Sequence, residues 1–225
     1  MDLQAIIIAA PSANCGKTEL ACRLIRALPG AQALKITRFH RESHCPVHGI
    51  DEHGDDNCDG CAPVPAGFEI VDDDATLRTP GKDSDRMIKA GASPVLWLRA
   101  APHVFEYALR AAMMRFDPSR PLVLEGNSAA TIIGFKGRVV LLWPQKTRGV
   151  KTSVLPALRR VDHLVLVESM GRKVIPNTLK SALSRNEMKQ NDLPELLWLP
   201  ENWWRQEPSE PEKALIAGLV EVSGR

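Results

Sequence analysis

The fold of this chain is decided by residues 6–20, "IIIAAPSANCGKTEL". The Gly-Lys-Thr at 16–18 closes a pattern typical of phosphate-binding loops, although Pro11 stands where such loops usually have their first glycine. The apolar run at 5–10 predicts a buried parallel strand before the loop, and leucines at helical spacing predict a helix over 18–28 after it. A strand, a tight loop and a helix in this order indicate a phosphate-binding loop rather than a simple helix cap.

The residue types in this loop fit phosphate chemistry. Backbone N–H groups and a helix N-terminus face an anion, Lys17 bridges the outer phosphates, and the Thr18 hydroxyl reaches Mg²⁺. We therefore expect Mg²⁺ and GTP or ATP as ligands; the base stays open because the sequence has no Asn-Lys-x-Asp guanine signature. The expected nucleotide contacts in the loop are Ser12, Ala13, Asn14, Cys15, Gly16, Lys17, Thr18 and Glu19.

Length and composition narrow the class of protein. The 225 residues are enough for one core, so we expect a single domain over 1–225. A formal net charge of +2 argues against nucleic acid or an anionic membrane as the main partner. The sequence has no run of roughly 18 apolar residues and no secretory signal at its start, so we expect a cytoplasmic protein.

Strand-like and helical patterns alternate along the chain. The expected strands are 5–10, 32–37, 94–99, 121–125, 138–143, 162–167 and 196–200. The expected helices are 18–28, 83–90, 103–115, 150–159, 176–185 and 209–222. This alternation predicts an α/β fold, a mostly parallel sheet with helices on both faces and ligands at the carboxyl ends of its strands. The pair Trp203-Trp204 is interpreted as a packing anchor without an assigned function.

Residues 38–68 interrupt this alternation and are predicted to form an insertion after the second strand. Cys45-x-x-His48 and Cys58-x-x-Cys61 have the two-residue gaps typical of tetrahedral Zn²⁺ sites. A metal would order a segment that has almost no apolar residues. An iron–sulfur cluster is the alternative, because three cysteines and a histidine also hold one. Further candidate ligands are His40, His44 and His53.

The other two cysteines are not expected to bind metal. Cys15 lies in the phosphate loop, where the helix N-terminus would activate its thiolate. Cys22 lies early in the first helix and is expected to be a small buried residue.

The stretch "TPGKDSDRMIKAGA", residues 79–92, supplies a second motif. Together with the phosphate loop it resembles the "PGKDS…R…AGA" signature of the molybdopterin-guanine dinucleotide biosynthesis protein B (MobB) family. Those proteins are P-loop proteins related to dethiobiotin synthetase and to metal-chaperone GTPases. Lys35 in "QALKITRFH" matches the family's lysine, and the Glu125-Gly126 pair in "LVLEGNSA" matches its Glu-Gly. Asn127-Ser128 stand where the family has Phe-Lys.

The resemblance implies a P-loop NTPase that shares its active site across a homodimer. A carboxylate at the end of an apolar strand lies beside the phosphate loop, so Glu125 is the expected catalytic partner of Lys17. Glu125 and Thr18 are also the expected Mg²⁺ ligands. The family signature adds Lys35, Lys82 and Asp83 to the nucleotide site, with Asp83 or Ser84 as the cap of the helix that follows.

The leading interpretation is a Mg²⁺-dependent NTPase acting in the maturation or delivery of a metal-containing cofactor, with a cofactor-biosynthesis or metalloenzyme protein as partner. Hydrolysis would be slow, because no arginine finger or water-positioning glutamine is identifiable. Three alternatives stay open: a metallochaperone GTPase that carries its metal on the insertion, a small-molecule ligase or kinase resembling dethiobiotin synthetase, and a zinc-stabilised adaptor that binds nucleotide without turnover.

Overall fold

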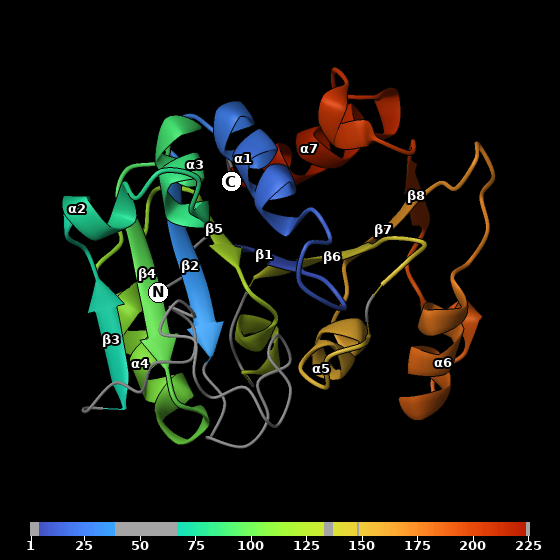
Figure 1. Cartoon of the computed structure of the whole chain (residues 1–225), viewed down its shortest axis with the longest axis horizontal. Coiled ribbons are helices and arrows are strands. Elements are labelled where there is room, and N and C mark those ends of the chain that lie inside the picture. The colour runs from blue at the N-terminus through green and yellow to red at the C-terminus, as the bar shows by residue number, and fades with distance from the viewer. Residues whose placement is uncertain (1–4, 39–66, 133–136, 148, 224–225) are drawn as a thin grey trace.

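The computed structural model describes residues 5–38, 67–132, 137–147 and 149–223 (Figure 1). Its strands form one eight-stranded sheet in the order β3-β4-β2-β5-β1-β6-β7-β8, in which only the pairing of β3 with β4 is antiparallel. The strands are β1 Ala5–Ala9, β2 Gln32–Arg38, β3 Phe68–Val71, β4 Val95–Ala100, β5 Leu122–Glu125, β6 Arg138–Trp143, β7 His163–Val167 and β8 Leu196–Leu199.

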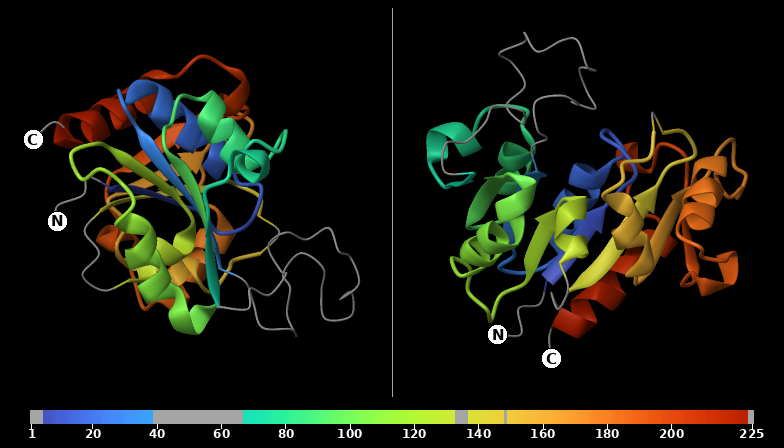
Figure 2. Two further views of the ribbon diagram at one scale, coloured as in Figure 1. Left: turned by 90° about the vertical axis from the view of Figure 1, so that its left-hand side faces the viewer. Right: turned by 90° about the horizontal axis from the view of Figure 1, so that it is seen from below.

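Helices cover both faces of the sheet (Figures 1 and 2). The helices are α1 Lys17–Ala27, α2 Asp74–Leu77, α3 Asp83–Lys89, α4 Phe105–Met113, α5 Val154–Arg159, α6 Asn177–Arg185 and α7 Glu210–Ser223. One face carries α1, α3 and α7, and the opposite face carries α4, α5 and α6. Strand β1 explains this arrangement, because Ile6 and Ile8 pack under α1 whereas Ile7 packs into the opposite core, and all three are buried.

The sequence-based prediction of an α/β fold with a mostly parallel sheet is confirmed. Each of the predicted strands and helices has a counterpart within a few residues of its expected bounds. One strand and one α-helix were not predicted: β3, an antiparallel edge strand, and the single-turn helix α2. The segment predicted as an insertion, 38–68, overlaps the fold at both ends, because Arg38 ends β2 and Phe68 begins β3.

The connections between strands lead in opposite directions across the sheet on either side of β1. From β1 the chain passes over β5 to reach β2, whereas from β5 it crosses to β6 on the other side of β1. The connections therefore diverge at the carboxyl end of β1, where open α/β sheets form their ligand crevice. The loop "PSANCG", residues 11–16, leaves β1 at this point.

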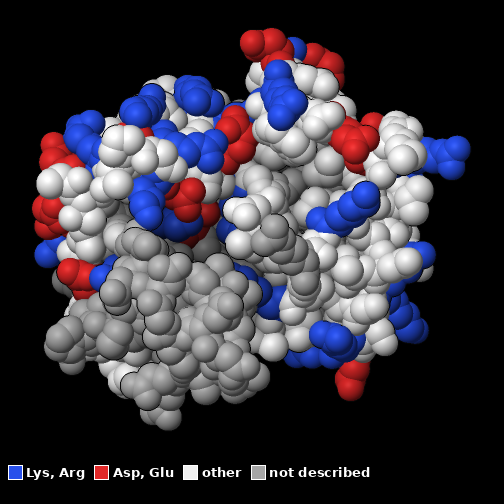
Figure 3. Space-filling model, in the orientation of Figure 1, with Lys and Arg blue, Asp and Glu red and all other residues white. Residues whose placement is uncertain are grey.

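On the face shown in Figure 3, the exposed charges of the described residues do not all have one sign. Figure 3 shows lysine and arginine side chains spread over this face, with aspartates and glutamates among them. This agrees with the small net charge. None of the helices in the described ranges is long and apolar enough to cross a membrane.

Candidate functional site

The loop between β1 and α1 has the curled backbone that phosphate binding requires. Asn14 and Gly16 have positive φ values of 57° and 90°, and Gly16 caps α1. A helix leaves its first N–H groups without partners inside the helix, and α1 presents those groups from Lys17 onward. The Lys17 ammonium donates to the Ser12 carbonyl oxygen at 2.9 Å, so it lies within the curl of the loop.

The surroundings of Lys17 disfavour its charged form, so its pKa is lowered. Burial lowers the pKa of Lys17, and the neighbouring carboxylate of Glu125 partly opposes that shift, while Lys35 and Lys151 add to it. A buried ammonium with two cations nearby would be stabilised by additional negative charge. The loop therefore attracts an anion through both its backbone and its side chain.

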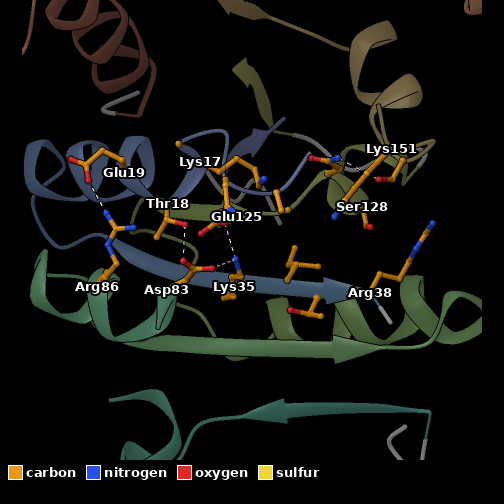
Figure 4. A pocket seen from close by; sticks show the side chains of 18 of the residues that line it. Lys17, Thr18, Glu19, Lys35, Arg38, Asp83, Arg86, Glu125, Ser128 and Lys151 are labelled. Atoms are coloured by element: carbon orange, nitrogen blue, oxygen red, sulfur yellow. Dashed lines mark hydrogen bonds and ion pairs between the residues drawn. The ribbon is translucent and has the colours of Figure 1, made fainter. Parts of the chain in front are cut away.

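Four side chains from four elements meet beside the loop (Figure 4). Lys35 on β2 donates to Glu125 Oε1 on β5 at 2.7 Å and also bonds the Asp83 carboxylate on α3. Thr18 on α1 donates to Asp83 Oδ1 at 2.8 Å. The parallel register explains the first contact, since Lys35 and Glu125 are direct partners across β2 and β5.

This cluster shifts the ionisation of its members. Burial lowers the pKa of Lys35, but the carboxylates of Glu125 and Asp83 outweigh burial and the net pKa is raised. For Asp83, burial raises the pKa, and the Lys35 charge and hydrogen bonds from Lys35 and Thr18 bring it below its ordinary value. Both groups are therefore held in their charged forms at neutral pH.

One carboxylate oxygen of the cluster lacks a hydrogen bond to the described residues. Glu125 is 2% exposed, and its Oε2 atom is buried without a hydrogen-bond partner among the residues that the structure describes. An unpaired carboxylate oxygen inside a protein is costly, and it is expected where a ligand or ion completes the site. Glu125 Oε2, the Thr18 hydroxyl and Asp83 together offer the hard oxygen ligands that fit Mg²⁺.

Asn127 connects the end of β1 to the segment after β5. Its Oδ1 accepts from the Ala10 N–H and its Nδ2 donates to the Ala10 carbonyl, both at 2.9 Å. The Lys151 N–H then donates to the Pro11 carbonyl at 2.8 Å. The entry to the loop is thus held from two sides. The sequence did not predict this role. Its one signal is that Asn127 stands where the MobB family, which the chain resembles, has a phenylalanine.

These side chains border a cavity of about 540 Å³. At one end Arg86 on α3 donates to Glu19 at 2.7 Å, and at the other end Arg38, Ser128 and Lys151 face the opening (Figure 4). The cavity is lined by Ala13, Asn14, Gly16, Lys17, Thr18, Glu19, Lys35, Ile36, Thr37, Arg38, Asp83, Arg86, Glu125, Gly126, Asn127, Ser128, Lys151, Thr152 and Ser153.

A second cavity, of about 500 Å³, adjoins the loop on the side of β6, β7 and β8. It shares Asn14, Gly16, Glu19 and Arg86 with the first cavity. Its other lining residues include two tryptophans, Trp203 and Trp204. The remaining residues around it are Cys15, Pro144, Gln145, Lys146, Val167, Glu168, Ser169, Met170 and Glu201.

Most of the nucleotide contacts predicted from the sequence lie around the first cavity, and three do not. Ser12 is buried and its hydroxyl lies 3.2 Å from the Cys15 thiol, whose residue borders the second cavity. Lys82 is exposed and does not line either of these cavities. Asp83 begins α3 rather than capping it, because the cap position falls on Lys82. The side chain of Asp83 is therefore available to Thr18 and Lys35.

Of the remaining cysteine predictions, the one for Cys22 falls on described residues and the zinc-site prediction does not. Cys22 is 2% exposed in the core, where burial raises the pKa of its thiol to about 11, as expected for an inert buried residue. The proposed zinc ligands Cys45, His48, Cys58 and Cys61 lie outside the described residues. Within the described ranges, no group of three or more His, Cys, Asp or Glu side chains is placed to hold a metal ion.

Comparisons with known proteins add little. No family model matches the chain, and no curated protein matches it. Among solved structures, the chain is similar to the "apo" form of LpxK from Aquifex aeolicus in complex with ATP. That match has 14% sequence identity and a TM-score of 0.39, and it covers 100% of this chain and 81% of that one. At this TM-score the likeness carries no argument about the site.

Proposed function

We propose that this protein binds a Mg²⁺–nucleoside triphosphate at the loop of residues 11–16 and hydrolyses it slowly. The observation that carries the proposal is the convergence of Lys17, Thr18, Asp83, Lys35 and Glu125 at the carboxyl ends of adjacent parallel strands. This convergence combines an anion-binding loop with oxygen ligands for a metal ion.

The positions of the two cavities suggest how a nucleotide would be oriented at the loop. Both include the loop, so a ligand with its phosphates there extends either toward Arg38 and Lys151 or toward Trp204, whose ring is exposed. Cations suit the terminal phosphates, and aromatic rings suit a base. We place the nucleoside in the second cavity and the terminal phosphate beside Lys17. The choice between ATP and GTP stays open.

Each residue then has a role in phosphoryl chemistry. Lys17 would bridge the outer phosphates. Thr18 with Asp83 or Glu125 would hold Mg²⁺, which when bound would supply positive charge beside those phosphates. The buried carboxylate of Glu125 orients the attacking water through Oε2, while Lys35 holds Oε1. Turnover is expected to be slow, because among the residues that the structure describes the arginine bordering the first cavity beside the loop, Arg86, is paired with Glu19.

Calorimetric titration with Mg²⁺–ATP and Mg²⁺–GTP tests the proposal. Wild-type protein should bind at least one of them, and Lys17→Ala should abolish binding while the thermal transition is preserved. Lys180→Ala serves as a control, because Lys180 is exposed on α6 and borders neither cavity. Lys82→Ala should behave like that control if Lys82 takes no part in binding. Equal affinity in wild type and Lys17→Ala would sink the assignment of the loop.

A second candidate function is transfer of the phosphoryl group to an acidic small molecule, as in a kinase or ligase resembling dethiobiotin synthetase. The observation that favours it is the far end of the first cavity, where Arg38, Ser128 and Lys151 leave room beside the expected terminal phosphate. Turnover that depends on an added carboxylic acid and falls in Arg38→Ala would select this function over simple hydrolysis.

We propose metal-cofactor maturation as the biological setting. The resemblance of "PGKDS" and Glu-Gly to the MobB family supports a role in metal-cofactor maturation, with 1–225 as one domain and a homodimer as the working assembly. The Cys/His segment would bind Zn²⁺ or an iron–sulfur cluster. A metallochaperone carrying cargo metal there and a non-hydrolysing zinc adaptor are the alternatives, and nucleotide-dependent metal release separates the first from the second.

A further inference from the structure

The phosphate loop contacts the C-terminal segment of the chain. Gly16, the last residue of the loop, lies so close to the Trp203 indole that a Cβ on Gly16 would come 3.1 Å from Trp203 Cζ2. Leu142 on β6 would be 3.3 Å away on another side. Trp203 is 2% exposed, so its ring forms a rigid wall behind the loop. The position of Trp203 therefore limits where the backbone of Gly16 lies.

Arg23 on α1 holds this tryptophan in place. Its Nη2 donates to the carbonyl oxygens of Trp203 at 2.8 Å and Gln206 at 2.7 Å, and its guanidinium carbon lies 5.2 Å from the centroid of the Trp203 ring. Its Nη1 donates to both carboxylate oxygens of Glu212 on α7, at 2.9 and 3.0 Å. One buried guanidinium thus joins the segment after β8, helix α7 and helix α1.

The same guanidinium continues toward the site. Arg23 Nε donates to Glu19 Oε1 at 3.4 Å, and Glu19 Oε2 accepts from Arg86 on α3 at 2.7 Å. Helix α3 begins with Asp83, which accepts from Thr18. The first turn of α1 is therefore held on one side by α3 and on the other by Trp203. Arg23 contacts Trp203 directly and is linked to α3 through Glu19.

We propose that Trp203, clamped by Arg23 and Glu212, is a positioning residue that sets the geometry of the phosphate loop, so that the docked C-terminal segment determines affinity for the phosphates. This inference rests on the proposed function and goes beyond it, because Trp203 lies almost two hundred residues from the loop in sequence and acts through the backbone of Gly16. By reciprocity, a ligand bound at the loop stabilises the docked segment.

Magnesium tripolyphosphate is the probe that tests this role, because it has phosphates and no base. Calorimetry should show that Trp203→Leu weakens its binding by about tenfold or more, since small displacements of positioning groups are costly. Trp203→Phe should restore most of the affinity by replacing the ring. The control is Trp198→Leu, because Trp198 lies on β8 and packs against the opposite face of the sheet. That variant should lose stability without losing affinity.

The outcomes separate the positioning role from the proposed function. If the wild-type protein binds neither tripolyphosphate nor a nucleotide, the proposed function is wrong. If the wild type binds but Trp203→Leu and Trp198→Leu bind equally well, only the positioning role is wrong. If Trp203→Leu affects ATP but not tripolyphosphate, Trp203 contacts the base and does not position the loop.

A measurement on the wild-type protein covers the case in which Trp203→Leu does not fold. Hydrogen exchange followed by mass spectrometry should show slower exchange of the amides of α7, Glu210–Ser223, when magnesium tripolyphosphate is added. Helix α6 on the opposite face provides the internal reference. Unchanged exchange in α7, under conditions where the loop itself becomes protected, would overturn the coupling.

Discussion

Lys35 Nζ lies 2.7 Å from Glu125 Oε1 on the adjacent strand and also bonds the Asp83 carboxylate, so one ammonium joins β2, β5 and α3. The strand register alone brings Lys35 opposite Glu125. Asp83 arrives from a helix 48 residues further along the chain. A single cation therefore compensates two carboxylates beside the phosphate loop, and its removal has consequences for both stability and binding.

Replacing Lys35 by Met should lower the free energy of unfolding by about 3 kcal/mol, because it leaves the buried Glu125 carboxylate unpaired. Urea denaturation at pH 7 measures the change. Lys213→Met is the matched control, since the Lys213 ammonium pairs with Glu210 by an i,i+3 contact in which both side chains are exposed. The control should cost much less, because solvent screens an exposed ion pair. Equal losses in the two variants would contradict a buried role for Lys35.

The free energy of unfolding at acidic pH should depend on the ionisation of Asp83. Its pKa is lowered in the folded protein, so its contribution is present above the ordinary value of 3.8 and is lost as pH falls through the folded value. Wild type should therefore exceed Asp83→Asn in stability at pH 7, and the difference should shrink as the pH falls below 3.8. Urea unfolding of both proteins across this range measures the difference. A gap that stays constant with pH would show that the Asp83 charge contributes nothing.

Glu125→Gln should retain nucleotide and lose Mg²⁺-dependent turnover. The amide oxygen still accepts from Lys35, whereas the carboxylate charge that binds Mg²⁺ or orients water is gone. Phosphate release assays combined with calorimetry separate the two effects. Glu69→Gln is the control, because Glu69 lies on the edge strand β3, pairs with Arg99 on β4 and does not line the cavity. Wild-type turnover in Glu125→Gln would reduce Glu125 to an ordinary strand end.

The sequence predicted the fold well because the signals are local. A strand buried on both faces is a continuous apolar run, as in Ile6 to Ile8, and such runs are legible without knowing their neighbours. The strand β3 was missed because it has only four residues and lies at the edge of the sheet, where Val71 is its one buried residue. The helix α2 was missed because one turn is too short to show a helical period.

The site was predictable only in part. The loop motif predicted Lys17 and Thr18 as residues of the candidate site, and the resemblance to the MobB family added Lys35, Asp83 and Glu125. The supporting residues escaped prediction because their partners are distant in the chain: Asn127 bonds Ala10, and Arg23 bonds Glu212. An asparagine or arginine with one long-range partner has no local pattern. Trp203 was expected to be a packing anchor, and the structure shows that what it packs against is Gly16.

Gly126, directly after Glu125, should tolerate no side chain. A Cβ there would lie 2.9 Å from Ile36 Cβ and 3.1 Å from the Ile36 carbonyl oxygen, and its φ is +152°. Gly126→Ala should therefore lower the free energy of unfolding by about 2 kcal/mol or more, through a clash added to backbone strain. Gly91→Ala isolates the strain, because Gly91 has a φ of +107° and nothing within 4 Å of an added Cβ. A smaller loss in Gly126→Ala than in Gly91→Ala would contradict the close approach of β2 and β5.

The Cys/His segment gives the last prediction, which rests on sequence alone. The purified protein should contain about one Zn²⁺ ion per chain, because Cys45, His48, Cys58 and Cys61 have the spacing of a tetrahedral site. Replacing Cys58 and Cys61 by serine should release the metal and make residues 40–66 sensitive to protease, since that segment has few apolar residues to fold it otherwise. Elemental analysis and limited proteolysis measure both effects.

The nucleotide site should survive this double substitution, because its contacts lie outside the segment. Hydrogen bonds link Thr18, Asp83, Lys35 and Glu125, and Lys17 bonds the Ser12 carbonyl. Nucleotide affinity should then fall only modestly. Asn57→Ala is the control within the segment, since an asparagine amide is not a zinc ligand, and it should keep the metal. Protein purified under reducing conditions without chelator that contains no metal would defeat the proposed zinc site. A brown, iron-containing sample from anaerobic purification would replace zinc with an iron–sulfur cluster.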